Sequence, residues 1–444
     1  TQFQSHKHLI YSSPATLAFN SPGAEGFGVK RAGLAVPDSI MLIVAPGCCG
    51  RNTSLISSMK EYNDRFYYLS QVTLNSSDRN VNWGTQLNYN PGGIIVDRYA
   101  NDEIGWEKSY KLNVGAEMRT VFGLSANVEY FTERRENILL NRIIPNTMGI
   151  IPYVKANLGK AKGKGVDMEL NYEKSFNKDL WITGRGTFTY ATSEAVEWEE
   201  PDYSETPWLS KVGKSLGQTW GYIAERLFVD EEEVKNSPTQ FGEYMAGDIK
   251  YRDVNGDGKI SELDKVPIGY PTTPEINYGF GLSAGYKGFD ASFFFQGSGR
   301  QSFWLDQKRI TPFMDGNAGE SDDDGLTGQN QVLQVIADNY WSENNRNPYA
   351  FWPRLSNQTV ANNNQTSTWF MQDATFLRLK SVELGYTFPR DLIKKIKVQN
   401  FRVYVSGTNL LCWSKFKLWD PEMAGNGFGY PIQRVFNVGI NLGF

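Results

Sequence analysis

Oxygen-bearing side chains recur at alternate positions in one short stretch near the middle of the chain. Counted from Asp253, loop positions 1, 3, 5, 7, 9 and 12 are Asp253, Asn255, Asp257, Lys259, Ser261 and Asp264. An EF-hand-type loop supplies Ca²⁺ with oxygen ligands at these positions, the seventh through a backbone carbonyl, and a glycine at position 6 makes the sharp turn. We therefore expect a calcium ion that fixes a loop. The alternative is a solvated turn rich in Asp, Asn and Gly, because the aspartate at position 12 is shorter than the usual glutamate.

Six tryptophans lie in or beside stretches that we expect to be long loops. They are Trp208, Trp220, Trp304, Trp341, Trp352 and Trp369. Sugar rings stack on aromatic faces, so this set is a candidate substrate-binding set at a glycan-binding mouth. The alternative is loop packing or the aromatic girdle that membrane barrels have.

The other reactive residue types form no catalytic pattern. The only histidines are His6 and His8, so the chain from about residue 78 onward lacks the histidine that Ser-His-Asp, Cys-His and most histidine-metal chemistry requires. Cys48 and Cys49 are adjacent and lack the conventional zinc spacing. The acidic runs at 322–324 and 231–233 are expected to be a loop tip and a helix start or solvated face. We expect no catalytic residue and no enzyme.

The elements that must position these residues are strands, because apolar and polar residues alternate over many segments. In the last ten residues, Phe436, Val438, Ile440, Leu442 and Phe444 share one face, opposite small or polar residues. This pattern is typical of a strand with lipid on one side and a watery lumen on the other. Eight further segments alternate in the same way, within 111–118, 124–130, 166–172, 182–190, 278–286, 289–295, 382–388 and 401–405.

Short and long connections alternate between these nine predicted strands. The short ones are 119–123, 174–179 and 287–288, with 389–400 intermediate, and the long ones are about 134–163, 194–274, 298–374 and 412–431. A transmembrane barrel has short periplasmic turns and long extracellular loops, whereas a soluble sandwich mixes loop lengths at both ends. Single-chain barrels have an even number of strands, so we expect an all-β fold of about nine or ten antiparallel strands from the carboxy-terminal part of a larger barrel, with 81–90 as a weak tenth strand.

Composition agrees with a membrane barrel and excludes other classes. Aromatic residues make up 14% of the chain, and no window is apolar enough for a membrane-spanning helix. The net charge of −4 and the lack of a basic tract indicate no nucleic-acid partner. No charged-then-apolar secretory signal opens the chain, so we expect that a signal was removed or that the chain is a piece of a longer protein.

From about residue 78 to 444 the chain resembles the SusC/RagA-like TonB-dependent outer-membrane transporters. The matching runs include IGWEKSYKLNVG (104–115), NLGKAKGKGVDMEL (157–170), PWLSKVGKSLGQTWGYIAERLF (207–228), GDIKYRDVNGDGKISELDKVPIG (247–269), FLRLKSVELGYTFP (376–389), FRVYVSGTNLL (401–411) and DPE (420–422). The resemblance implies a barrel of about 22 strands in the bacterial outer membrane. It also implies a plug that couples to the TonB complex, a SusD-like lipoprotein partner and insertion by the barrel-assembly machinery.

Residues 1–75 do not follow that pattern. VKRAGLAVPDSIMLIVAPGCCGRNTSLISSMKEYNDRFYYLS (29–70) resembles the start of nitrogenase component 1-like oxidoreductases, a cytoplasmic family in which cysteines hold iron–sulfur clusters. A reducing cytoplasmic segment does not suit an exported barrel. We interpret 1–75 as an unrelated, poorly ordered fragment joined by misassembly, and a genuine fusion is the alternative.

We therefore predict a carboxy-terminal barrel portion, residues 78–444 with long loops at 194–274 and 298–374, of a transporter for oligosaccharides or peptides. Polar lumen positions would tune passage, among them Asp167, Glu169, Arg185, Asp290 and Arg402. One alternative is a calcium-stabilised, secreted all-β glycan-binding module. Another is an iron–sulfur oxidoreductase, which only residues 29–70 suggest.

Overall fold

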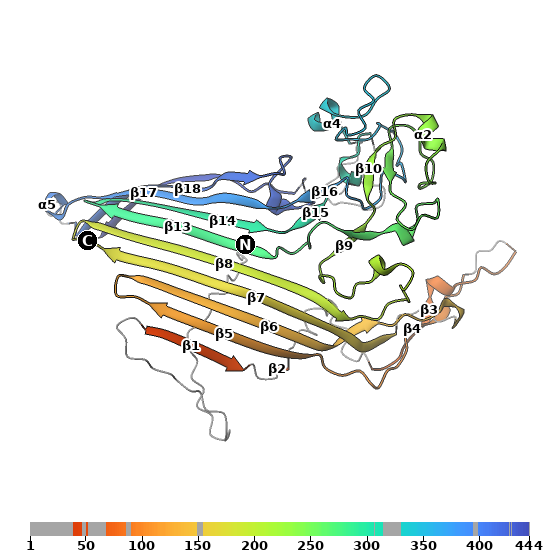
Figure 1. Ribbon diagram of the computed structural model, residues 1–444, viewed down its shortest axis with the longest axis horizontal. Coiled ribbons are helices and arrows are strands. Elements are labelled where there is room, and N and C mark those ends of the chain that lie inside the picture. Colours follow the sequence, from red (N-terminus) through yellow and green to blue (C-terminus); the bar gives the residue numbers. More distant parts are fainter. Residues whose placement is uncertain are drawn as a thin grey trace.

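One large antiparallel sheet dominates the computed structural model, which describes residues 39–46, 50–51, 68–85, 90–148, 154–305, 307–313, 330–393, 398–425, 427 and 429–443. Neighbouring strands follow the order β1-β5-β6-β7-β8-β13-β14-β17-β18-β19, and β2 also pairs with β5 (Figure 1). The nine predicted strands are confirmed as β5 (Lys108–Arg119), β6 (Leu124–Asn141), β7 (Lys155–Ser175), β8 (Leu180–Glu197), β13 (Ile276–Tyr286), β14 (Phe289–Gly299), β17 (Phe376–Thr387), β18 (Asn400–Ser414) and β19 (Val435–Gly443).

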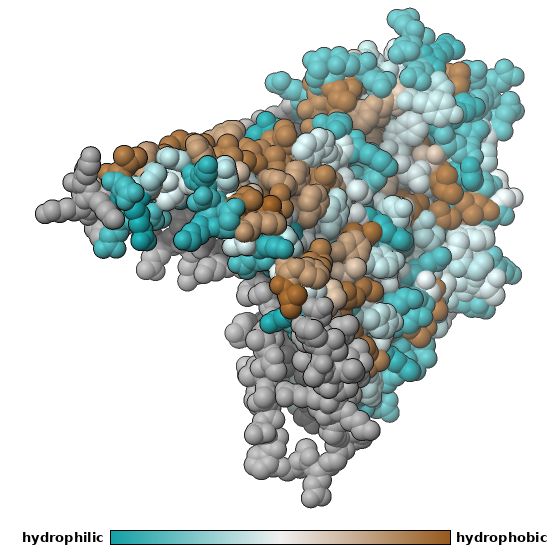
Figure 2. Space-filling model, turned by 60° about the vertical axis from the view of Figure 1, so that its left-hand side comes forward, coloured by the Kyte–Doolittle hydropathy of each residue, from teal (hydrophilic) through white to brown (hydrophobic). Residues whose placement is uncertain are grey.

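The outer face of this sheet is apolar and exposed. Cross-strand register places Val403 opposite Ile440 and Val405 opposite Val438, so the apolar alternation of one strand continues into the next. The side chains of Val438 and Ile440 are 77% and 64% exposed. Figure 2 shows hydrophobic residues gathered over the strands, while the loop end is largely hydrophilic. An apolar sheet face without a protein layer over it is expected where lipid is the solvent.

The opposite face of the sheet is polar and carries cross-strand ion pairs. The Arg402 guanidinium on β18 contacts Asp290 on β14 and donates to Glu383 on β17 at 2.6 Å. Gly385 makes room for this side chain, because a Cβ there would lie 2.7 Å from Cζ of Arg402. The face that is watery in a barrel is therefore built from charges that satisfy one another.

The short and long connections lie at opposite ends of the strands, as predicted. At one end are tight turns and the short helix α5 (Arg390–Ile393), and at the other are the long loops (Figure 1). The predicted bounds of the 134–163 loop are wrong, because β6 and β7 continue as a paired ladder to Asn141 and Lys155. A bulge interrupts this ladder near Asn137, which has a φ of 58°. Apolar and polar residues do not alternate there, because Ile138, Leu139 and Leu140 are consecutive, so the ladder extends without the pattern that marks a membrane strand.

The long loops fold into a cap with its own small elements. These are β9 (Thr219–Gly221), β10 (Ala224–Leu227), α2 (Glu231–Lys235), β11 (Ile249–Tyr251), β12 (Val266–Ile268), β15 (Ser302–Trp304), α3 (Gln307–Ile310), α4 (Gln334–Asp338) and β16 (Met371–Asp373). A buried apolar cluster joins the connection between β8 and β13, the connection between β14 and β17, and Phe416 after β18. The principal hydrophobic core of the described chain thus lies in the cap and not beneath the sheet.

The amino-terminal edge of the sheet is paired. β1 (Ser39–Pro46) runs antiparallel to β5 from Ser39 opposite Arg119 to Pro46 opposite Leu112, and β2 (Gly50–Arg51) pairs with the far end of β5. The weak tenth strand predicted over 81–90 is not found in its described part, 81–85 and 90, whereas β3 (Gln71–Ser76) and β4 (Gly93–Arg98) form a separate hairpin. Cys48, Cys49, residues 322–324 and Phe444 lie outside the described residues.

Candidate functional site

The predicted calcium loop sits on the cap between β11 and β12. The carboxylate of Asp253 accepts hydrogen bonds from the backbone N–H groups of Gly256 and Gly258, both at 2.7 Å. These two glycines have φ values of 77° and 82°, in the left-handed region that a tight acidic loop requires. The Ile260 N–H donates to the Thr239 carbonyl at 2.7 Å, and the buried Ile260 side chain anchors the loop to the cap core.

The last predicted ligand, Asp264, is fully buried and faces back into the loop. One carboxylate oxygen accepts from the Val254 N–H at 2.8 Å, and the other accepts from the Ser261 N–H at 2.8 Å in a capping box. Among the described residues no three acidic, histidine or cysteine side chains gather closely enough to hold a metal ion. The donor types and turn conformation suit Ca²⁺, while the carboxylates themselves satisfy backbone donors.

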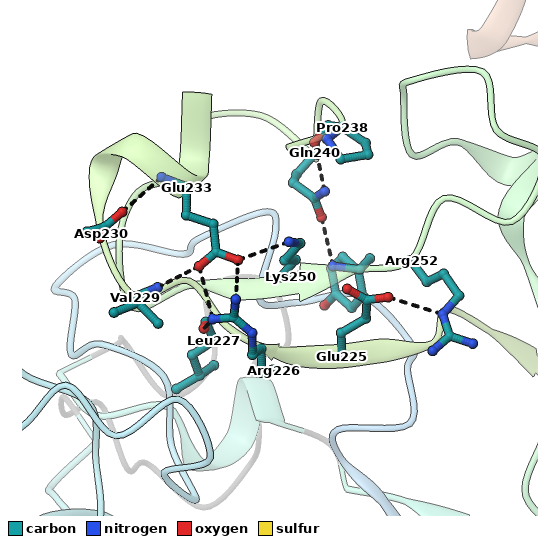
Figure 3. A network of polar contacts seen from close by, with 11 residues as sticks. Glu225, Arg226, Leu227, Val229, Asp230, Glu233, Pro238, Gln240, Lys250 and Arg252 are labelled. Carbon is teal, nitrogen blue, oxygen red and sulfur yellow. Dashed lines mark hydrogen bonds and ion pairs between the residues drawn. The ribbon is translucent and has the colours of Figure 1, made fainter. Parts of the chain in front are cut away.

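A charge network beside this loop fixes helix α2, and Figure 3 shows it. Asp230 caps the helix, as expected for the acidic run, and Glu233 accepts from Arg226 at 2.6 Å and from Lys250 at 2.9 Å. Burial alone would raise the pKa of Glu233, but hydrogen bonds from Lys250 and the Val229 N–H, with the charges of Lys250 and Arg226, hold the pKa below its ordinary value. The network ties α2 to β10 and β11.

A second polar network joins two long loops through a buried carboxylate. Asp248, which is fully buried, accepts from Asn363 at 2.8 Å and from the Met245 N–H at 2.9 Å, and it pairs with Arg354 at 2.8 Å. Burial raises the pKa of Asp248 despite the Arg354 charge. The buried Asn362 also bridges the loops, since it donates to the Ile249 carbonyl at 2.6 Å. These polar contacts therefore join the β8–β13 and β14–β17 connections into one structural unit.

The structure separates the six predicted tryptophans into different environments. Trp341 and Trp352 are about 95% buried in the cap core, and Trp304 and Trp369 pack against that core. Trp208 and Trp220 lie together, because the Trp220 indole N–H donates to the Trp208 carbonyl at 3.2 Å and the Trp208 indole N–H donates to the Leu263 carbonyl at 2.8 Å. The set does not form one stacking surface.

The luminal wall brings the predicted polar positions into two groups. Glu169 and Arg185 form an ion pair at 3.6 Å, and Asp290 and Arg402 meet farther along the sheet. Asp167 lies on the same face, opposite Glu129 and Thr189 in the register. A hollow of about 520 Å³ lies beside the first group, lined by Asn171, Glu173, Thr183, Arg185, Gly281, Ser283, Ser292, Phe294 and Ser381, with Tyr172, Gly184 and Phe293. Glu383 was not among the predicted lumen positions, although it lies between the outward Val382 and Leu384 and alternation therefore places it on the luminal face.

An arginine clamp fastens the last long loop to the wall. Arg378 on β17 donates to Asp420 at 2.7 Å and pairs with Glu422 at 2.8 Å, and its side chain is 3% exposed. In the sequence these two acidic residues stood out only within the DPE run. Their spacing gave no signal of the distant arginine. The clamp fixes the loop over the sheet.

Relatives are large receptors of which this chain matches only a part. No protein-family model matches the chain. TonB-dependent receptor P26 of Formosa agariphila is 28% identical over 382 residues, which cover 79% of this chain and 36% of that protein. TonB-dependent receptor SusC of Bacteroides thetaiotaomicron is 22% identical over 409 residues, 88% of this chain and 37% of that protein.

A solved structure shows the same fold. The RagAB peptide transporter superposes with a TM-score of 0.60 at 22% identity, over 91% of this chain and 40% of the transporter chain. The partial barrel predicted from the alternating strands is thereby confirmed. The chain has the fold of the carboxy-terminal part of a bacterial outer-membrane β-barrel and is similar to SusC-like TonB-dependent transporters.

Proposed function

We propose that this chain forms the carboxy-terminal wall and the loop cap of a transporter that imports oligosaccharides or peptides. The supporting observation is the two-faced sheet, apolar outside and ion-paired inside, with a packed cap at its loop end. A secreted glycan-binding module has no use for a broad exposed apolar face. The relatives are named as receptors and transporters, so an enzyme is not favoured.

The proposal includes partners that the relatives suggest. A SusD-like lipoprotein would close over the cap, energy would come from the TonB complex through a plug, and the barrel-assembly machinery would recognise the closing strand β19. In this proposal the lipoprotein contact falls on the cap, and recognition by the assembly machinery falls on β19. The substrate passes, in this proposal, along the polar wall that carries Arg185 and Arg402.

Transport is tested in the source bacterium with its intact gene. We expect deletion of the gene to abolish growth on at least one member of a panel of defined oligosaccharides and peptides, and re-expression to restore that growth. A tagged protein should co-purify with a lipoprotein encoded beside it. Unchanged uptake of the whole panel after deletion would contradict the proposal.

We also propose that Ca²⁺ binds the loop from Asp253 to Asp264 and rigidifies the cap. The measurement is Tb³⁺ luminescence of the detergent-purified protein, competed by Ca²⁺, together with protease resistance of the cap. Asp253→Asn with Asp257→Asn should abolish both effects. The matched control is Asp202→Asn, because Asp202 also caps a backbone N–H in an exposed turn. Equal Tb³⁺ binding by the double variant would refute a calcium site here.

A further inference from the structure

Basic side chains cluster on the outer face of β6 and β7, just beyond the apolar belt. Val128 and Tyr130 point outward on β6 and are 43% and 45% exposed, and Arg134 is the second outward position after Tyr130. On β7, Lys164 and Lys162 follow the outward Val166 in the direction of the loops. Register pairs Arg134 with Lys162 and places Lys164 one step nearer the belt, opposite Thr132.

The height of this cluster matches the upper boundary of the lipid core. The stretch from Leu124 to Arg134 rises about 33 Å along the strand at roughly 3.3 Å per residue. At a strand tilt of about 40° this corresponds to about 25 Å along the membrane normal, the usual height of the apolar band of a barrel. The outward-facing Tyr130 and Tyr190, both aligned with Val166, mark the aromatic girdle directly below the cluster.

The cations of the cluster remain accessible to a ligand. Arg134 and Lys162 are 64% and 50% exposed, and their pairs with Glu136 at 2.9 Å and Glu194 at 3.0 Å are surface ion pairs, which hold little free energy. Lys164 is exposed and forms no ion pair within the described part of the chain. On β8 the outward residue opposite Lys164 is Thr192 and the outward residue opposite Lys162 is its ion-pair partner Glu194, so β8 adds no cation to the cluster at this height.

We propose that Arg134, Lys162 and Lys164 bind the phosphate groups of the phosphorylated glycolipid that forms the outer leaflet of the bacterial outer membrane. The position favours this occupant, because the girdle fixes the headgroup level and the three cations stand at that level on the lipid-facing side. Arginine and lysine hold phosphate through charge-assisted hydrogen bonds, and the two tyrosines contact the sugar and acyl boundary. This site lies outside the lumen and takes no part in the proposed transport path.

The test is binding of purified bis-phosphorylated lipid A to the full chain in detergent micelles, measured by native mass spectrometry. We expect Arg134→Gln with Lys162→Gln and Lys164→Gln to weaken binding by about fivefold for each cation removed. The matched control is Lys211→Gln with Lys214→Gln and Lys417→Gln, three exposed loop lysines, which should bind lipid A as the parent does. Lys164→Glu alone, at the cation without an ion pair, provides a second variant if the triple variant does not fold.

Two further binding measurements identify which part of the lipid the site recognises. Lipid A stripped of its phosphates should bind at least about tenfold more weakly, and millimolar inorganic phosphate should not displace the intact lipid, because the girdle and acyl contacts also contribute. Equal lipid A binding by the parent, the triple variant and Lys164→Glu would overturn the site. Displacement by inorganic phosphate alone would overturn its assignment to a lipid headgroup.

Discussion

Single charged residues hold the long loops in place. Arg378 is the clearest case, because it is nearly fully buried between Asp420 and Glu422. A buried cation with two carboxylates is stable only while all partners are present, since removal of one leaves uncompensated buried charge. The DPE run stands out in the sequence but its partner does not, because Arg378 and Asp420 are 42 positions apart and no pattern joins them.

Replacement of Arg378 by Met should therefore release the last long loop. We expect a loss of about 3 to 5 kcal/mol in local stability, because two carboxylates would face each other without a cation. The measurement is the rate of trypsin cleavage within 415–434 in the purified protein. Arg346→Met, at an exposed loop arginine, is the control and should cleave as the parent does. Equal cleavage of both variants would show that the clamp does not restrain the loop.

Acid should loosen the network around Glu233. Because the folded pKa lies below the ordinary value of 4.5, the contribution of this carboxylate is complete above about pH 4.5 and is lost as the pH falls through the lowered pKa. Pepsin cleavage of the cap, followed from about pH 5.5 to pH 3 and divided at each pH by the cleavage rate of an unfolded protein, should accelerate in that range. The Glu233→Gln protein should be cleaved faster than the parent at the upper end of this pH range and should lose the acid dependence. The Glu243→Gln protein should be cleaved as the parent is. A parent profile that matches Glu233→Gln would contradict this account.

At the scale of elements, alternation predicted the strands within the membrane and failed outside it. Phe436 to Leu442 could be read correctly because lipid on one face and water on the other impose opposite polarities at successive residues. The ladder from Arg134 to Asn141 was not predicted because its residues do not alternate in polarity and a bulge between Arg135 and Ile138 shifts its register. The burial of Trp341 and Trp352 was equally hidden, since a tryptophan in a cap core and one at a binding mouth have the same local sequence signal.

The two faces of β19 should tolerate charge very differently. Ile440→Lys places an ammonium group on the lipid face near mid-strand, and we expect a loss of about 2 to 4 kcal/mol. Asn441→Lys, one residue on, points into the lumen and should cost much less. Urea unfolding of the complete transporter, refolded into lipid vesicles, measures both variants. Equal destabilisation would mean that the faces of β19 are assigned wrongly.

At the scale of the whole molecule, the sheet path is open. Its ends are β1 and β19, which do not pair with each other among the described strands. Backbone donors and acceptors along an unpaired edge are costly in lipid and invite pairing with another chain.

The 444-residue chain refolded by itself should therefore not form a closed pore. Planar-bilayer recordings of the refolded chain should show no discrete single-channel conductance, and cross-linking should reveal association through strand edges. Reproducible unitary conductance from monomeric protein would overturn this prediction.

The cap core has a consequence for the order of assembly. Its buried residues run from Tyr222 to Phe416, so its contacts join segments far apart in sequence, whereas each hairpin of the wall joins neighbouring strands. Long-range contacts carry the larger loop-closure cost and form late. We therefore expect the short hairpins of the wall to pair first and the cap core to close last, once Phe416 after β18 is available. Until then its aromatic residues are exposed, and this interval is when the newly made protein is most open to proteases and chaperones.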